Sequence, residues 1–79
     1  MEKLVKYIVD NLVNNHEAVS VTSEKENEKT CVIRVKVASE DMGKVIGKQG
    51  KIAQSIRSIV KTASASEENK VRYIVKFEE

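Results

Sequence analysis

The sequence predicts an α+β domain in which three helices cover one face of a three-stranded mixed sheet. Two observations support this. Apolar residues alternate in three segments, as in half-buried strands, and recur every three or four positions in three others, as in amphipathic helices. The order along the chain is αββααβ. Because each helical segment has only one apolar face, a single core between the helices and the sheet is the economical arrangement.

Residues 1–79 are long enough for one domain with two packed layers and too short for a multidomain enzyme. A composition of 41% hydrophobic and 33% charged residues predicts a folded chain. The single cysteine, Cys31, excludes an intramolecular disulfide and a zinc cluster of thiolates, and it favours the reducing cytoplasm. No apolar run is long enough for a signal peptide or a membrane span, so we expect no membrane association.

The first half of the chain predicts a helix followed by a β-hairpin. Apolar pairs recur every four positions across residues 3–14, which is typical of an amphipathic helix. β-branched residues alternate with polar ones in residues 18–25 and 30–38, so we expect two antiparallel strands there. The polar residues 24–29 between them predict an exposed loop, and Cys31 falls on the buried face of the second strand.

The second half predicts two helices and a last strand. We expect Ser39 to cap a short helix, with Asp41 as negative charge in its first turn and Gly47 at its end. A longer helix then runs to about residue 65, and residues 66–70 form a polar connection. The alternation in residues 71–77 predicts a strand, which a crossover of this length can place parallel to the second strand.

The same patterns assign individual side chains to faces. Val32 and Ile74 fall on the sheet face away from the helices, where we expect exposed β-branched residues or, as the alternative, part of a protein contact patch. Tyr7 and Ile59 fall on the apolar faces of their helices. All three aromatic residues of the chain lie on apolar faces, which argues against recognition of bases by aromatic stacking.

The glycines point to a functional turn. The chain has three, and all of them, Gly43, Gly47 and Gly50, lie within eight residues. Glycine adopts positive φ and exposes its backbone N–H, while it destabilises the interior of a helix. The spacing does not match a P-loop, since Gln49 follows Lys48 where a Ser or Thr would bind magnesium. It also does not match the dinucleotide fingerprint, because Gly43, Gly47 and Gly50 are spaced G-x-x-x-G-x-x-G.

Charge is distributed unevenly around this turn. Residues 42–66 contain no acidic residue and five basic ones, whereas the rest of the chain has nine basic and twelve acidic residues. A purely basic segment around a glycine turn is the electrostatic pattern of a phosphate-binding surface.

A Gly-x-x-Gly turn between two helices fits the backbone of a single-stranded nucleic acid. The glycines allow a sugar-phosphate chain to approach backbone N–H groups, and the following helix directs its positive end to the same place. Lys48 and Lys51 add attraction for phosphate, Gln49 adds hydrogen bonding, and the neighbouring apolar residues are candidates for a groove that receives bases. The candidate binding residues are Lys44, Val45, Ile46, Gly47, Lys48, Gln49, Gly50, Lys51, Ile52 and Arg57.

The run VIGKQGKI at residues 45–52 resembles the GXXG signature of KH domains, and the element order resembles the bacterial type II arrangement. Over nearly the whole chain, the sequence is similar to the KhpA family of small bacterial RNA-binding proteins. The resemblance implies a type II KH fold and a loop that holds ~4 nucleotides of single-stranded RNA. It also implies a cytoplasmic RNA chaperone or post-transcriptional regulator that pairs with a KhpB-like KH protein or with itself.

Three alternatives remain open at this point. One is a structural adaptor whose main role is dimerisation, with the glycine loop as part of the protein contact. Another is a helix-hairpin-helix protein that binds DNA phosphates, although the flanking strands argue against it. An enzyme finds least support, because the basic segment lacks a general base and no carboxylate pair or metal set converges. We expect no cofactor and no small-molecule substrate.

Overall fold

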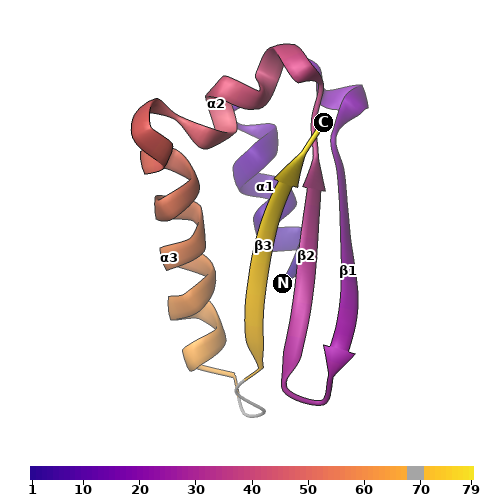
Figure 1. Cartoon of the computed structure of the whole chain (residues 1–79), viewed down its shortest axis with the longest axis vertical. Coiled ribbons are helices and arrows are strands. Elements are labelled where there is room, and N and C mark those ends of the chain that lie inside the picture. The colour runs from indigo at the N-terminus through magenta and orange to yellow at the C-terminus, as the bar shows by residue number, and fades with distance from the viewer. Residues whose placement is uncertain (68–70) are drawn as a thin grey trace.

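The computed structural model describes residues 1–67 and 71–79 and has the predicted order of elements (Figure 1). Part of the expected connection over residues 66–70 therefore lies outside the described residues. Short 3₁₀ segments occupy His16–Ala18, Ser39–Asp41 and Lys48–Gly50. The helices and strands are α1 (Glu2–Asp10), β1 (Ser20–Asn27), β2 (Thr30–Lys36), α2 (Met42–Ile46), α3 (Lys51–Ala65) and β3 (Arg72–Glu78).

The sheet has the order β1-β2-β3 and is mixed, as predicted. β1 pairs with β2 antiparallel, and β2 pairs with β3 parallel. Ile33 in the central strand lies opposite Ser23 of β1 and Val75 of β3. The parallel pairing is possible because α2 and α3 provide the crossover. α3 descends beside β3, and the glycine turn between α2 and α3 projects from the body of the protein (Figure 1).

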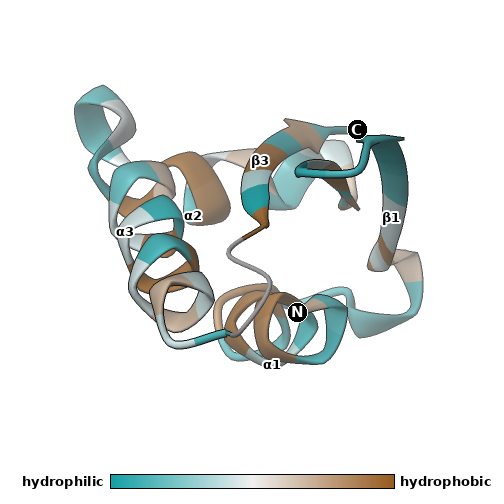
Figure 2. Ribbon diagram, turned by 90° about the horizontal axis from the view of Figure 1, so that it is seen from below, coloured by the Kyte–Doolittle hydropathy of each residue, from teal (hydrophilic) through white to brown (hydrophobic). Residues whose placement is uncertain are grey.

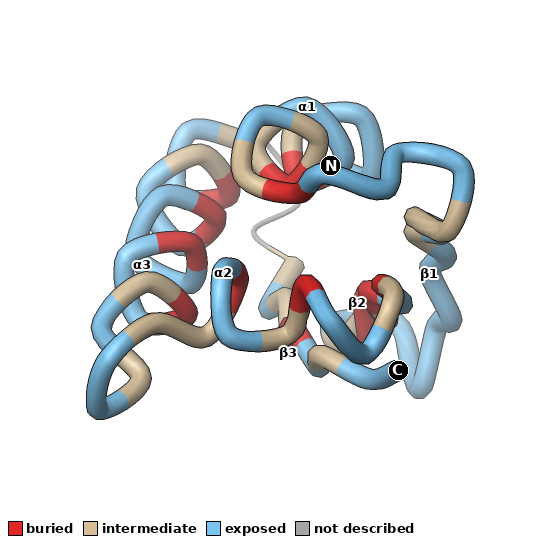
Figure 3. The backbone as a smooth tube through the Cα atoms, turned by 90° about the horizontal axis from the view of Figure 1, so that it is seen from above, coloured by how far each residue is buried: buried red, intermediate tan, exposed pale blue. Residues whose placement is uncertain are grey.

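One core joins the helices to a single face of the sheet. The apolar sides of α1 and α3 turn inward (Figure 2), and the buried positions follow the same sides (Figure 3). α2 adds one fully buried side chain to this core. The buried members are Val5, Val9, Val13, Ile33, Val35, Val37, Val45, Ile56, Val60 and Val75. The fold class expected from the sequence is confirmed.

Two predicted boundaries are wrong. β1 continues to Asn27, so only Glu28 and Lys29 form the turn where a loop over residues 24–29 was expected. Backbone pairing with β2 holds these residues in the strand, since an edge strand can be polar on both faces. α1 ends at Asp10 rather than near residue 14, although the following Val13 still enters the core.

Three side-chain assignments also need correction. Val32 is only 2% exposed, because it sits in the central strand between Glu24 of β1 and Ile74 of β3. Tyr7 is 70% exposed and Ile59 is 44% exposed, since the sheet does not cover those sides of α1 and α3.

In residues 1–67 and 71–79, no helix has the length and apolar character needed to cross a bilayer.

Candidate nucleic-acid interface

The glycine turn is built from left-handed backbone. Gly47 has a φ of 76°, Gln49 of 58° and Gly50 of 75°. Gln49 is the only residue other than glycine with positive φ among the described residues. Such a run ends α2 abruptly and redirects the chain into α3, so that the turn stands clear of both helices.

The three glycines have different reasons to be glycine. A Cβ on Gly47 would lie 2.6 Å from Cγ1 of Ile52, so Gly47 is required both by φ and by packing. Gly50 needs only its positive φ, because nothing lies within 4 Å of its Cβ position. Gly43 lies within α2, outside the turn, and nothing lies within 4 Å of its Cβ position either. The position of Gly43 agrees with the expected short helix that ends at Gly47.

Backbone donors in the turn divide into two groups. The N–H of Gly47 donates to the carbonyl of Gly43 at 2.9 Å, and that of Gly50 donates to the carbonyl of Gly47 at 3.1 Å. The N–H of Lys51 donates to the carbonyl of Lys48. Within residues 1–67 and 71–79, the N–H groups of Lys48 and Gln49 have no acceptor, so both can donate to a bound ligand. The two donors are adjacent, so one anionic group could bind both.

Positive charge surrounds these donors. Lys48 and Lys51 are exposed, and no side chain caps the N-terminus of the fifteen-residue α3, whose N-cap is Gly50. The aligned peptide dipoles of α3 give that end of the helix a partial positive charge. The turn therefore presents two ammonium groups, two backbone donors and a helix N-terminus to the same region.

The apolar residues beside the turn belong mainly to the core. Val45 is completely buried, so it cannot line an RNA groove, and the sequence-based assignment is wrong for this residue. Ile46 and Ile52 are half-buried and pack against the core. Their position explains how the turn is held, because Ile52 fills the space beside Gly47.

Arg57 is fixed against β3. Its Nε and Nη2 donate to the carbonyl oxygen of Val75 at 3.3 and 3.2 Å. The guanidinium also lies 5.5 Å from the centre of the Phe77 ring. The carbonyl belongs to the outer edge of the sheet, since β3 has a neighbour on only one side. Arg57 thus connects the middle of α3 to the middle of β3 instead of extending freely into solvent.

A groove runs between α3 and β3 next to this arginine. It has a volume of about 500 Å³. Sequence reasoning included Arg57 but missed the remaining lining residues, because their proximity depends on α3 packing beside β3. The available signal was Lys61, which falls in the acid-free segment. The groove is lined by Arg57, Lys61, Ser64, Arg72, Tyr73, Ile74 and Val75.

Tyr73 closes one end of this region. Its hydroxyl donates to Oε2 of Glu67 at 3.1 Å. Burial, and secondly the bond to Glu67, raises the pKa of the Tyr73 phenol above its ordinary value, so the hydroxyl keeps its proton. Tyr73 therefore contributes a neutral side chain to the groove, and its hydroxyl is bonded to the Glu67 carboxylate.

Lys44 does not extend toward the turn. Its Nζ lies 3.4 Å from Oδ1 of Asp41, which is completely buried. Asp41 also accepts the backbone N–H groups of Asn14 and Asn15 at 3.3 and 3.0 Å. The N–H of Asn15 is the main reason that the pKa of Asp41 is below its ordinary value; burial opposes it, and Asn14 and Lys44 add to it. We therefore leave Lys44 out of the candidate interface.

The capping expected at the start of this region is also wrong. Ala38, not Ser39, is the N-cap of the 3₁₀ segment, and no side chain bonds to its first turn. Asp41 does lie in the first turn of this segment, as expected, and its carboxylate accepts hydrogen bonds from the segment that follows α1.

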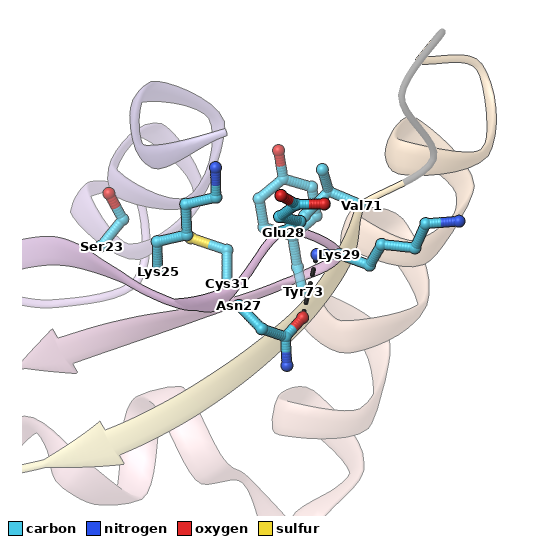
Figure 4. A pocket seen from close by; sticks show the side chains of 8 residues that line it. All are labelled: Ser23, Lys25, Asn27, Glu28, Lys29, Cys31, Val71 and Tyr73. Atoms are coloured by element: carbon cyan, nitrogen blue, oxygen red, sulfur yellow. Dashed lines mark hydrogen bonds between the residues drawn. The ribbon is translucent and has the colours of Figure 1, made fainter.

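Another hollow lies away from this groove. It occupies about 560 Å³ at the turn between β1 and β2, the end of the sheet away from the glycine turn (Figures 1 and 4). Its polar groups do not converge on one point: Asn27 is bonded to the backbone N–H of Lys29, and the side chain of Lys29 points away (Figure 4). We do not include this hollow in the interface.

A shallow apolar patch lies on the outer side of α1 and α3. Its lining is almost entirely apolar, and Ile59 is its most prominent member. Tyr7, one helical turn after Leu4, adds a further exposed aromatic ring on α1. The patch consists of Leu4, Ser58, Ile59, Thr62 and Ala63.

Across residues 1–67 and 71–79, no three His, Cys, Asp or Glu side chains are grouped as metal ligands.

Comparison with known proteins is consistent with this geometry. The family model of the KhpA/KhpB KH domain matches residues 2–76. Proteins named RNA-binding protein KhpA are 52% identical over 71 residues in Caldanaerobacter subterraneus subsp. tengcongensis, 48% over 71 in Clostridium perfringens and 42% over 72 in Listeria monocytogenes. These alignments cover 90%, 90% and 91% of this chain and 93% of each relative. No solved structure matches the chain.

Proposed function

The chain belongs to the KhpA/KhpB family of KH domains, and from this we propose that residues 1–79 act as one KH domain that binds single-stranded RNA. The observation that carries the proposal is the pair of backbone N–H groups at Lys48 and Gln49, which have no acceptor among the described residues and belong to a glycine turn with exposed lysines. A phosphate is the ligand that such donors and charges recognise together.

The path of the RNA follows from the groove. A strand whose phosphate binds the turn would continue between α3 and β3, past Arg57, toward Lys61 and Arg72. Bases in the groove would meet Ile74 and polar groups of the β3 edge, so hydrogen bonding and apolar contact would replace aromatic stacking. Of the candidates from the sequence, the proposed contacts are Gly47, Lys48, Gln49, Gly50, Lys51 and Arg57, with Ile46 and Ile52 as supports.

We assign no catalytic role to the chain. The relatives are named for RNA binding, and residues 42–66, which contain the turn, include no acidic residue or histidine that could act as a general base. A role as a small cytoplasmic RNA chaperone or post-transcriptional regulator agrees with a domain that binds a backbone and few bases. A helix-hairpin-helix protein is a poorer description, because α2 and α3 are the crossover of a sheet.

The experiment is a loop variant with a matched control. Lys48→Asp with Gln49→Asp places negative charge at the two donors, and Asp tolerates the left-handed backbone of Gln49. We expect the variant to keep its fold by circular dichroism and to lose binding to a fluorescent oligouridine of about 8 nucleotides in anisotropy titrations. Unchanged affinity in the folded variant would refute the proposal.

The control changes net charge by the same amount at the other end of the sheet. Lys25→Asp with Asn27→Asp lies on β1, and an aspartate at position 27 can still accept the N–H of Lys29. We expect this variant to bind oligouridine nearly as well as the unmodified chain. Equal losses in both variants would mean that overall charge, not the turn, determines affinity.

We also propose that the apolar patch pairs with a second KH domain, either another copy of this chain or a KhpB-like protein. The exposed side chain of Ile59 within the apolar patch supports this pairing. The chain would then dimerise in addition to binding RNA. Ile59→Lys should shift sedimentation of the chain toward monomer, while Thr22→Lys on exposed β1 adds the same charge without effect. A monomer at micromolar concentration without any substitution would leave only the heteromeric form, to be tested by adding a KhpB-like protein.

A further inference from the structure

Asp41 joins two segments that are far apart in the sequence. Its Oδ2 accepts the N–H of Asn15 at 3.0 Å, and its Oδ1 accepts the N–H of Asn14 at 3.3 Å and lies 3.4 Å from Nζ of Lys44. The residue is 0% exposed. A buried carboxylate persists only where its bonds compensate for lost hydration, so these contacts hold the segment after α1 to the start of α2.

α2 depends on such contacts for its position. It has only five residues, fewer than an isolated helix needs for stability. Its own buried contribution to the core is Val45. Asp41 precedes α2 directly, and Gly47 follows it directly, so the two are separated by about 8–9 Å of helix. The Asp41 contacts therefore help to set where the glycine turn stands relative to the groove.

The same carboxylate determines the direction of Lys44. A helical side chain reaches naturally toward the N-terminus of its helix, and here Lys44 reaches back by three residues to Asp41. This direction is away from Gly47 and the turn. Asp41 compensates the ammonium charge of Lys44. Lys44 differs in this from Lys48 and Lys51, which have no carboxylate partner among the described residues.

We propose that Asp41 is a positioning residue for RNA binding: it holds α2 and the glycine turn in place and keeps Lys44 out of the set of cations that bind phosphate. The inference rests on the proposed RNA-binding function. It implies that Lys44 contributes little to affinity while Asp41 is present, and that it becomes a phosphate-binding cation when the carboxylate is removed.

Four full-length chains test this: the unmodified chain, Lys44→Gln, Asp41→Asn and the double variant. Each is titrated with the same oligouridine over a range of salt concentrations. Lys44→Gln should change the dissociation constant by less than about twofold and leave the slope of log K against log salt unaltered. Asp41→Asn should weaken binding by about tenfold, because an asparagine replaces one of the two accepting oxygens by an NH₂ donor.

The decisive readout is the salt slope. In Asp41→Asn we expect the slope to steepen by about 0.7, the value for one additional phosphate contact on a single strand. Adding Lys44→Gln should restore the original slope. A merely structural aspartate would produce weaker binding without a change that depends on Lys44.

Two further results would overturn the inference. One is a shallower slope for Lys44→Gln alone, which would make Lys44 a direct phosphate contact. The other is unchanged affinity of a folded Asp41→Asn chain. If that variant does not fold, Asp41→Glu replaces it: the charge remains, the extra methylene displaces α2, and binding should weaken with an unchanged slope. Failure of the unmodified chain to bind RNA would instead refute the proposed function.

Discussion

The Cβ position of Gly47 lies 2.6 Å from Cγ1 of Ile52, so the turn and the first residues of α3 are packed against each other without space for a methyl group. We expect Gly47→Ala to destabilise the chain by about 1–3 kcal/mol, through this overlap and the positive φ. Gly43→Ala is the matched control. Its Cβ meets nothing within 4 Å, so it should stabilise α2 by about 0.5–1 kcal/mol. Urea unfolding of both variants measures the difference, and equal effects would contradict the packing argument.

Gln49 occupies left-handed backbone with a φ of 58°. A β-branched residue such as valine is strained in this conformation. We expect Gln49→Val to cost about 1–2 kcal/mol of unfolding free energy. The same change at Gln54, which is exposed in regular α3, should cost no more than about 0.7 kcal/mol of helix propensity. Gln49→Asn should be neutral or stabilising, because asparagine tolerates this conformation. A smaller cost at Gln49 than at Gln54 would show that the turn relaxes.

Arg57 combines two hydrogen bonds to the Val75 carbonyl with the face of the Phe77 ring. Arg57→Lys keeps the charge but cannot reproduce this planar contact. We expect a loss of about 0.5–1.5 kcal/mol in thermal or urea unfolding, with the salt slope of RNA binding unchanged. Arg57→Ala removes the charge as well, so it should lower the affinity for RNA and flatten the slope of log K against log salt. Equal stability of the Arg and Lys chains would mean that the bridge to β3 contributes nothing.

Asp41 should make the chain acid-sensitive. Its pKa is lowered in the folded state, mainly by the N–H of Asn15, so its contribution to stability is present above the unfolded-state pKa and is lost as the pH falls through the folded value. The unfolded value is about 3.9, so the loss occurs below about pH 4. Thermal midpoints between neutral pH and about pH 3 should fall more steeply for the unmodified chain than for Asp41→Asn. Parallel curves would contradict this role.

Much of the fold was accessible from periodicity alone. Alternation in β2 and β3 and the one-sided apolar pattern of α3 predicted those elements, because burial on one face dictates which residues are apolar. Periodicity predicts a first strand that ends before β1 does, because the last residues of β1 are polar on both faces and only backbone pairing with β2 holds them in the strand. Val32 was assigned to an exposed face because periodicity reports which way a side chain points and not how closely its neighbours cover it.

The candidate site was predictable where it is local. The glycines and lysines of the turn are adjacent in sequence, and their spacing alone indicated contact with a nucleic-acid backbone. The groove was not predictable, since it depends on α3 lying beside β3 and brings Arg57 together with Arg72 across 15 residues of chain. The bonds of Asp41 to Asn14 and Asn15 are equally long-range, so its role could not be separated from that of an ordinary first-turn acid.

The salt dependence of RNA binding tests the central claim most directly. Lys48→Gln with Lys51→Gln removes two ammonium groups from the turn and leaves the backbone donors in place. If the turn binds phosphate, the slope of log K against log salt for oligouridine should be shallower by about 1.4 than for the unmodified chain, with the circular dichroism spectrum preserved. An identical slope in a folded double variant would contradict the assignment of the glycine turn as the RNA-binding element.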